Sequence, residues 1–438
     1  MGKGILYAGV AILAIALVAG VLYITYIGSN GAGQLSSNGS TFNYNYSSAN
    51  ATAIAGSDNN FTFSAYRILS GSSNESGNMF FSPFSAFVAM SMVAEGASGK
   101  TASQIYKGLD LSDNIPQNHA GFASILSSLS GKNAGYSLSV ADALWVEKTY
   151  PFRQSFIGLL NEYYNATAYP ADFTGNPNAV GSAINAWVSN KTYGKIQNLL
   201  PAGSLTTTTK AVLVNAVYFH GMWKHKFNRA DTTDQNFYVN PSQTVSVPMM
   251  YQQLNASYYD NGTIQVLELD YNDSNVTMLI VLPKSSFNVS GVEKGLSAAG
   301  IKSIEHSLGY VPVRVWLPRF NITESMGMNQ LFESLGITDA FDYKLANFSK
   351  MANFSELTPA QRTLYISNVL QKAFVTVDEN GTTAAAATAV GITGVAVSAP
   401  PALPVVFRAD HPFLFFIIDK RSGAILFMGR IYNPAGSS

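Results

Sequence analysis

Residues Val377 to Val397 read VDENGTTAAAATAVGITGVAV, and this stretch constrains the fold more than any other part of the chain. No charged residue follows Glu379 until Arg408. The four consecutive alanines favour a helix, whereas the threonine, valine and isoleucine residues after them favour a strand. A long uncharged segment in a compact domain is usually a functional loop or a disordered one. The residues alone leave helix, strand, exposed loop and disorder open.

The sequence on either side of this stretch predicts a mixed domain of helices and strands. An apolar strand at 373–377 leads directly into it. Ser82 supplies the N-cap of a helix that begins with proline. The apolar run 211–219 (AVLVNAVYF) has the length of a strand buried on both faces, and the alternation at 311–317 indicates a half-buried strand. Helical spacing dominates the first half and strand patterns the second, so we expect the α+β class.

Composition excludes several kinds of protein. The 438 residues include no cysteine, and 26 basic residues balance 26 acidic ones. The absence of cysteine rules out disulfides, thiolate metal sites and thiol catalysis. A net charge of zero gives no electrostatic support for nucleic-acid binding. We therefore expect no nucleic-acid partner, no metal and no cofactor.

Catalytic motifs are almost absent from the chain. It contains no Gly-x-Ser-x-Gly, Ser-x-x-Lys or His-Glu-x-x-His motif and no phosphate-binding loop. His220 and His225 flank Trp223, but their spacing of five residues does not place them on one helical face. We interpret both as structural and predict no enzymatic activity. A membrane-tethered hydrolase is the least favoured hypothesis.

The N-terminus predicts a membrane anchor. Residues 5–27 form an uncharged apolar run preceded by Lys3, and about 20 such residues span a bilayer as a helix. A cleaved signal peptide, whose apolar core is usually about 7–15 residues, is the alternative. Lys3 places the N-terminus inside and the remainder outside the cell. We divide the chain into an anchor (1–27), a flexible Gly/Ser/Asn-rich spacer (28–56) and one globular domain (57–438).

Acceptor motifs for N-glycosylation are unusually frequent. The chain has sixteen Asn-x-Ser/Thr motifs, whereas its composition predicts about six. Their asparagines are Asn38, Asn45, Asn50, Asn60, Asn74, Asn165, Asn190, Asn255, Asn261, Asn272, Asn275, Asn288, Asn321, Asn347, Asn353 and Asn380. This excess predicts a glycoprotein whose domain lies outside the cytoplasm, or a secreted protein if the N-terminal segment is cleaved.

The segment DENGTTAAAATAV (378–390) resembles the hinge of the reactive-centre loop of inhibitory serpins, a family of serine protease inhibitors. That hinge runs acidic-x-Gly-Thr-x-Ala-Ala-Ala-Ala-Thr. Other segments resemble the family in the family's own order, at 78–105, 140–156, 184–201, 213–227, 317–325, 335–341, 410–419 and 429–434. The resemblance covers roughly residues 57–435 and is to a prokaryotic-type member carrying an N-terminal anchor.

The resemblance implies a serpin fold of three β-sheets, about eight to nine helices and an exposed reactive-centre loop. The hinge residues that it assigns are Glu379, Gly381, Thr382, Ala384, Ala385, Ala386, Ala387 and Thr388. The shutter and breach residues that it assigns to the central sheet are Ser82, Ser85, Asn215, Gln371 and Trp223. Gln371 stands where many members carry a histidine and cannot change its charge, so we do not expect a pH-sensitive shutter at that position.

The resemblance also implies suicide inhibition by a monomer. A target serine protease attacks the loop, and insertion of the cleaved loop into the central sheet preserves the covalent acyl complex. Family spacing from Glu379 places the reactive bond between Val395 and Ala396, whereas a count back from the strand at Phe407 places it near Ser398 or Ala399. The alternative hypothesis is a non-inhibitory serpin that acts as a cell-surface binding module.

Side chains around this bond restrict the target. No arginine or lysine lies between Lys372 and Arg408, and no large aromatic residue, leucine or methionine lies between Glu379 and Pro401. The small apolar residues that remain fit a shallow apolar specificity pocket. We therefore expect elastase-like or subtilisin-like serine proteases as targets.

Overall fold

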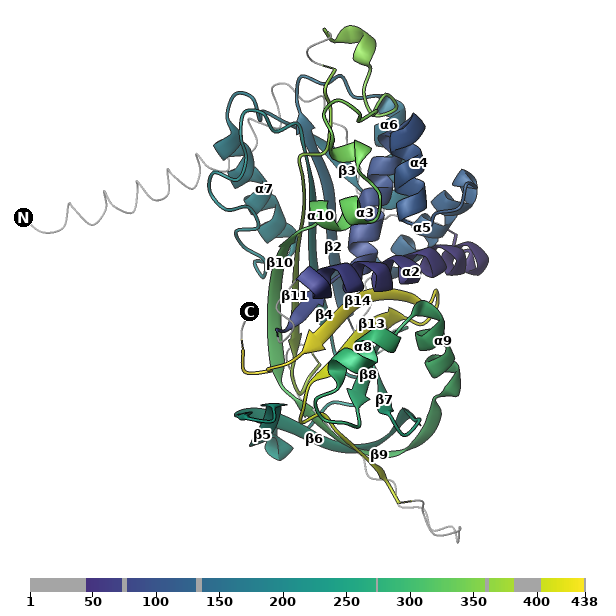
Figure 1. Cartoon of the computed structure of the whole chain (residues 1–438), viewed down its shortest axis with the longest axis vertical. Helices are drawn as coiled ribbons and strands as arrows, with labels where there is room; N and C mark the ends of the chain where they lie inside the picture. The colour runs from purple at the N-terminus through teal and green to yellow at the C-terminus, as the bar shows by residue number, and fades with distance from the viewer. Residues whose placement is uncertain are drawn as a thin grey trace, which may run out of the picture. The chain divides into compact units, whose positions relative to one another are not determined.

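A computed structural model describes residues 45–72, 77–130, 136–272, 275–358, 362–381 and 403–436 (Figure 1). Within these ranges the chain forms nine α-helices and fourteen β-strands. The α+β class is therefore confirmed. The predicted anchor at 5–27 and most of the predicted spacer lie outside the described residues.

Five strands form the sheet that positions the candidate site (Figure 1). Their spatial order is β10 (Phe320–Gly327), β11 (Asn368–Val377), β4 (Ala211–Gly221), β2 (Tyr136–Glu147) and β3 (Thr167–Ala171). The two strands at its centre, β11 and β4, run parallel, whereas β10 and β2 are antiparallel to their central neighbours. Nearly every residue of β4 is buried, as its continuous apolar run predicts for a strand covered on both faces.

The remaining nine strands form a second hydrogen-bonded network. Eight follow the order β1 (Met79–Phe81), β14 (Ala424–Ile431), β13 (Phe413–Asp419), β8 (Val276–Pro283), β7 (Ile264–Asp270), β6 (Gln243–Asp260), β9 (Gly309–Pro318) and β12 (Val405–Arg408). β5 (Thr233–Asn240) pairs with β6. β6 joins β7 through only four register pairs, Ser257–Asp260, before it continues along β9. The sequence predicts three sheets. The short β6–β7 junction joins two of the expected groups of strands into one hydrogen-bonded network.

Helices fill the space between the sheets and cover their outer faces. Their bounds are α2 (Ser48–Ser72), α3 (Pro83–Gly96), α4 (Gly99–Gly108), α5 (Ile115–Leu129), α6 (Gln154–Tyr164), α7 (Pro177–Lys191), α8 (Val289–Gly295), α9 (Ala298–Ser307) and α10 (Asn329–Ser334). α3 contacts β14 of one sheet and both β4 and β2 of the other, which explains why all but one of its residues are buried. Ser82 caps this helix by accepting a hydrogen bond from the Ser85 N–H, and Pro83 follows it, as predicted.

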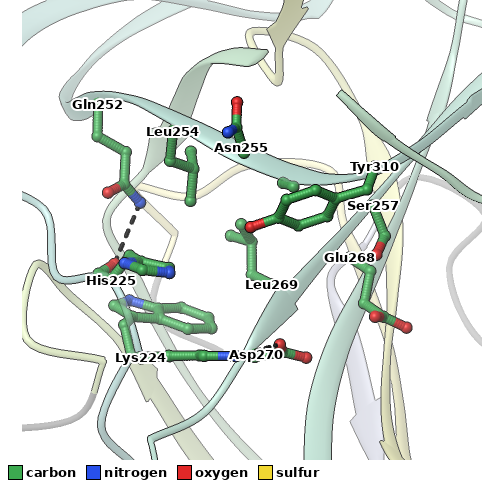
Figure 2. Close-up of a pocket in the computed structure, with 12 residues that line it drawn as sticks. Lys224, His225, Gln252, Leu254, Asn255, Ser257, Glu268, Leu269, Asp270 and Tyr310 are labelled. Carbon is green, nitrogen blue, oxygen red and sulfur yellow. Dashed lines mark hydrogen bonds and ion pairs between the residues drawn. The ribbon is translucent and has the colours of Figure 1, made fainter. Parts of the chain in front are cut away.

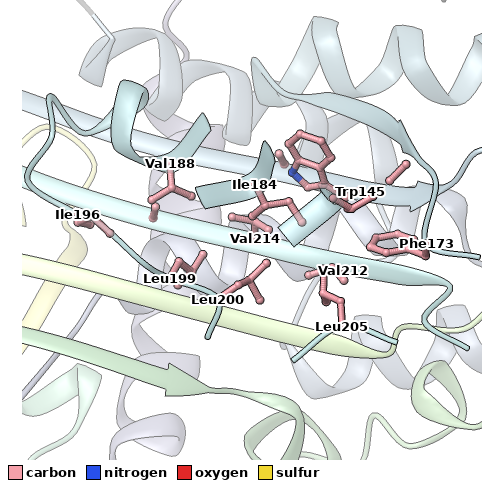
Figure 3. Close-up of a cluster of buried hydrophobic side chains, with 14 residues drawn as sticks. Trp145, Phe173, Ile184, Val188, Ile196, Leu199, Leu200, Leu205, Val212 and Val214 are labelled. Atoms are coloured by element: carbon pink, nitrogen blue, oxygen red, sulfur yellow. The ribbon is translucent and has the colours of Figure 1, made fainter. Parts of the chain in front are cut away.

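α7 covers the face of the five-stranded sheet opposite α3 (Figure 3). Val180, Ile184 and Val188 of the helix belong to one buried cluster with Val212 and Val214 of β4. Alternate residues of β4 point to the other face. The sheet is thus enclosed from both sides, and any strand added at its centre meets packed side chains on both faces.

The start of the folded region corrects one predicted boundary. α2 begins at Ser48, inside the range 28–56 that the sequence assigned to a spacer, and it buries Ala51, Ile54 and Ala55. These three side chains have the i, i+3, i+4 spacing of a helix face. The pattern predicts the helix only weakly, because two of the three are alanine. Among the described residues, no helix combines the length and apolar composition that crossing a membrane requires.

Candidate functional site

The parallel contact between β11 and β4 is the central feature of the candidate site. Seven register pairs join the strands, from Asn368 opposite Val212 to Phe374 opposite Tyr218. β11 ends at Val377 and leads into the segment that begins at the predicted hinge. A chain that turned back from this end would run antiparallel to both strands. It could therefore hydrogen-bond to β11 on one side and to β4 on the other.

Polar side chains on three neighbouring strands form a ladder across this contact. Gln371 of β11 lies opposite Asn215 of β4, and Asn215 lies opposite Asp142 of β2. Gln371 Nε2 donates to Asn215 Oδ1 at 2.6 Å, and Asn215 Nδ2 donates to Asp142 Oδ1. Gln371 and Asn215 are buried. Separating β11 from β4 therefore breaks a buried side-chain hydrogen bond as well as the backbone pairing.

The start of α3 holds this ladder from beneath. The Ser82 N–H donates to Gln371 Oε1 at 2.9 Å, and Gln371 Nε2 donates to the Ser82 carbonyl at 2.8 Å. Ser85 Oγ accepts a hydrogen bond from Asn215 and donates to Asp142 Oδ1 at 3.1 Å. The structure therefore brings together the four residues that the sequence assigned to the shutter, and their role in strand opening stays a prediction.

Asp142 is the member of this group that the sequence prediction missed. Burial raises the pKa of Asp142 to about 7, although its hydrogen bonds from Ser85 and Asn215 lower it in part. The sequence carried a signal, because Asp142 is the one charged residue within the strand segment SLSVADALWV. A charged residue in a mostly apolar strand needs specific partners.

Trp223 fixes the chain just beyond the end of β11. Its indole Nε1 donates to the Asp378 carbonyl at 2.9 Å, and its backbone N–H donates to the Asn380 carbonyl at 3.0 Å. The ring is 2% exposed and stacks on Tyr271 with 4.6 Å between ring centroids. The breach tryptophan that the sequence assigned thus contacts the first residues of the hinge.

Glu379 is tied down by its side chain. Its carboxylate accepts hydrogen bonds from Arg319 and, at 2.7 Å, from Thr232 Oγ1. Burial raises the pKa of Glu379, but these hydrogen bonds, Arg319 first, outweigh it and leave the pKa below its ordinary value. Its carbonyl also accepts from the Phe227 N–H at 2.9 Å. The acidic residue therefore anchors the base of the predicted loop.

Gly381 occupies a corner that no other residue fits. Its φ angle is +104°, a conformation that L residues rarely adopt. A Cβ at this position would collide with the Gly221 carbonyl and the Trp223 backbone nitrogen at the end of β4. Gly381 and Asp378 exchange backbone hydrogen bonds of 3.1 Å. This close approach explains the glycine of the hinge motif.

A small pocket lies directly beside this anchor (Figure 2). It has a volume of about 30 Å³ and opens between β6 and β7, with Trp223, Lys224 and His225 on one wall. Lys224 pairs with Asp270 at 3.3 Å, and Gln252 donates to the His225 carbonyl at 3.3 Å. Across the described ranges, no group of histidine and acidic residues could hold a metal ion.

The remaining predicted site residues belong to the hinge and to the reactive bond. Thr382, Ala384, Ala385, Ala386, Ala387 and Thr388 of the hinge, and Val395 and Ala396 of the reactive bond, lie outside the described residues. Their assignment stays a prediction from the sequence.

Comparison with known proteins identifies the family. The family described as "Serpin (serine protease inhibitor)" matches residues 56–434. The chain belongs to the serpin family. A serpin-like protein of Thermococcus kodakarensis is 39% identical over 86% of this chain and 84% of its own length. Leukocyte elastase inhibitor A of Rattus norvegicus is 37% identical over 85% of this chain and 97% of its own length.

Solved structures show the same fold. Human thyroxine-binding globulin, solved in complex with its hormone, superimposes with a TM-score of 0.79 and 26% identity over 88% of this chain and 100% of that one. Serpin48 of the insect Tenebrio molitor superimposes with a TM-score of 0.76 and 30% identity over 87% of this chain and 98% of that one. The serpin fold predicted from the sequence is confirmed.

Family membership supports protease inhibition as the general activity of the chain. Serpins are protease inhibitors and not catalytic enzymes, and several relatives are named as inhibitors.

Replacing Glu379 tests whether the Arg319 contact anchors the hinge. We expect Glu379→Gln to lower the thermal unfolding midpoint at pH 7, since it weakens a charge-assisted bond worth about 1 kcal/mol at a partly exposed partner. Glu379 has a lowered pKa, so its stabilisation is present above its ordinary value of 4.5 and is lost as the pH falls through its lower, folded-state pKa. The two proteins should therefore converge in strongly acidic solution. Exposed Glu333→Gln is the control, and equal midpoints for Glu379→Gln and wild type at pH 7 would contradict the assignment.

Proposed function

We propose that this serpin traps serine proteases by inserting its cleaved reactive-centre loop between β11 and β4. The observation that carries the proposal is the parallel pairing of these two strands directly before the hinge. The inserted strand would run antiparallel to both and would replace one set of ladder hydrogen bonds with two. The gain in backbone pairing and burial drives the reaction forward.

Both faces of the sheet limit which loop residues can enter. On one face, Leu370 and Phe374 of β11 pack against the cluster beneath α7, and on the other, α3 holds Gln371 and Asn215. Large or charged side chains would overpack this space or bury an unpaired charge. The segment 382–392 contains only threonine, alanine, valine, glycine and isoleucine. Its composition therefore suits insertion.

The chemistry belongs to the target protease. Its catalytic serine attacks the carbonyl carbon of Val395, the peptide nitrogen of Ala396 leaves as an amine, and an ester joins Val395 to the protease. Insertion then carries the ester-linked protease away from the reactive position and distorts its catalytic residues, so water does not release it. The serpin supplies no catalytic group.

We expect the targets to be elastase-like or subtilisin-like. Val395 and its neighbours Ala396 and Val397 fit a shallow apolar specificity pocket and offer no basic or large aromatic side chain. Relatives from Rattus norvegicus and Homo sapiens carry the name leukocyte elastase inhibitor and are 37% identical to this chain. Both observations favour this class over trypsin-like proteases.

Incubation with a protease panel tests the proposed function. We expect complexes that survive SDS with elastase-like or subtilisin-like enzymes and none with trypsin. The released C-terminal fragment should begin at Ala396, or at Ser398 if Val397 is the reactive residue. A fragment beginning before Gly394 or after Pro401 would contradict the assigned bond. Cleavage without any stable complex, and without a rise in thermal stability, would favour the non-inhibitory binding module.

A charge at the start of the hinge should convert the inhibitor into a substrate. In Thr382→Arg, insertion would bury an unpaired guanidinium at a cost of several kcal/mol, so deacylation would precede insertion. We expect the fraction of protease trapped as stable complex to fall at least severalfold while loop cleavage continues. Thr382→Ser keeps a small uncharged side chain and serves as the control. An unchanged complex yield in Thr382→Arg would refute insertion at this point.

We also propose that the domain is displayed outside the cell by the anchor at residues 5–27. The support comes from the apolar run and from the acceptor motifs, since none of the fourteen acceptor asparagines within the described ranges is buried. Protease treatment of intact cells should release the domain, with a cytoplasmic protein as the control. Survival on intact cells but digestion after lysis would place the domain inside.

A further inference from the structure

We propose that the outward face of β6, β9 and β12 is a docking surface for an acidic patch on the target protease. The inference rests on the proposed function, because it concerns how the protease reaches the reactive bond. It adds a determinant of specificity that lies outside the reactive-centre loop.

The docking face consists of two rows of side chains that cross the three strands. In the order β12, β9, β6, the first row is Val406, Arg314 and Gln253, and the second row is Arg408, Trp316 and Tyr251. The first row is exposed and the second is half-buried, whereas Val313, Val315 and Leu317, which alternate with them on β9, are buried. The face therefore looks away from the core, and β6 and β9 lie at the lower end of the view in Figure 1.

Trp316 is the centre of the docking face, and two arginines contact its ring. The guanidinium carbon of Arg314 lies 5.9 Å from the ring centroid, and that of Arg408 lies 5.2 Å from it. Both distances are within the range of about 6 Å over which an indole face attracts a cation. Tyr251 adds a tilted ring contact with 4.8 Å between centroids. The cations are thus held in place before a partner arrives, which lowers the entropy lost on docking.

The charge of the docking face favours an acidic partner. Arg408 pairs with Asp410 at 3.0 Å and donates to Gln235 of β5. Arg314 is exposed and has no acidic partner among the described residues. One cation of the face is therefore left without a counter-charge. Complementary charge on a partner raises the rate at which the two proteins associate.

The composition of the docking face is that of a protein interface. Tryptophan, tyrosine and arginine are the residue types that most often dominate binding energy at such interfaces. They supply four of the six side chains here, and Val406 beside them is 42% exposed. The face thus combines aromatic anchors with a free positive charge.

The chain itself brings the protease to the docking face. Val395 of the assigned reactive bond lies ten residues before Val405, the first residue of β12. Fully extended, ten residues span at most about 35 Å. A protease domain of about 250 residues has a radius of gyration of about 18 Å. Its surface can therefore reach the face while its active site holds the bond.

Docking at this face acts before cleavage only. It speeds the encounter that presents the reactive bond to the protease. The trapped fraction is decided later, by loop insertion between β11 and β4 in competition with deacylation. The rate constant of inhibition and the fraction of protease trapped should therefore respond separately to changes in the docking face.

The second-order rate constant of inhibition tests the inference. The full chain would be reacted with two subtilisin-like proteases, one of net negative and one of net positive charge. We expect Arg314→Glu to slow inhibition of the acidic protease at least about fivefold at low salt, with a smaller effect at high salt, because salt screens exposed charges. Inhibition of the basic protease should not slow. The trapped fraction should match that of the wild type with both proteases.

A matched control makes the same charge change elsewhere. Lys344 is exposed, its ammonium lies 5.3 Å from the ring centroid of Tyr343, and it follows η2 (Asp339–Phe341), which contacts α4. Lys344→Glu should leave both rate constants at the wild-type values. Trp316→Leu keeps an apolar side chain but removes the ring, and it should also slow inhibition of the acidic protease. If that variant does not fold, Arg314→Glu decides alone.

Three results would overturn the inference and leave the proposed function intact. The first is a wild-type rate constant for Arg314→Glu with the acidic protease. The second is equal slowing with both proteases, which would mean that the face contacts the chain's own loop. The third is a wild-type dimer that Arg314→Glu dissociates, which would assign the face to a second copy. If the wild type forms no stable complex with any protease and gains no thermal stability on loop cleavage, the proposed function fails and the inference fails with it.

Discussion

The rest of the structure depends on one contact, the parallel pairing of β11 with β4. Parallel neighbours in a sheet are joined by long connections, and here residues 222–367 connect the end of β4 to the start of β11. The pairing uses seven register positions, and Gln371 and Asn215 reinforce it with a buried bond. The two strands already hydrogen-bond to each other. A strand inserted antiparallel between them would form one set of backbone hydrogen bonds with β11 and a second set with β4. In the proposed mechanism, this difference contributes the free energy that drives loop insertion.

We propose that the polar side chains at this contact resist its opening, because burial of apolar side chains does not favour the closed over the open arrangement. The apolar residues of β4 are buried whether or not a further strand enters, so they do not oppose opening by themselves. In the closed arrangement that the structure shows, Gln371 hydrogen-bonds to both Ser82 and Asn215. Buried hydrogen bonds of this kind are costly to leave unmade, which gives the closed sheet its specificity.

The hinge adds a second constraint at the end of β11. Trp223, Arg319 and Thr232 hold Asp378, Glu379 and Asn380 through backbone and carboxylate bonds, and Gly381 turns in a space too small for a Cβ. The loop therefore departs from a fixed point. A fixed departure point matters because the register of an inserted strand is set by the residue at which it starts.

The sequence by itself determined the family, the α+β class, the N-cap of α3, the buried strand β4 and the hinge motif. Each of these follows from residues that are close together in the chain or from its composition. It also named Ser82, Ser85, Asn215 and Gln371, although nothing in their spacing says that they touch. Only the tertiary structure placed Asp142 beside Asn215, put Arg319 on Glu379 and started α2 at Ser48. These features depend on partners 60 to 73 residues away in the chain, or on small side chains whose burial only packing reveals. Sequence periodicity indicates which face of a helix or strand is apolar. A charged side chain in the interior of a sheet is explained only by the partners that the tertiary fold brings to it.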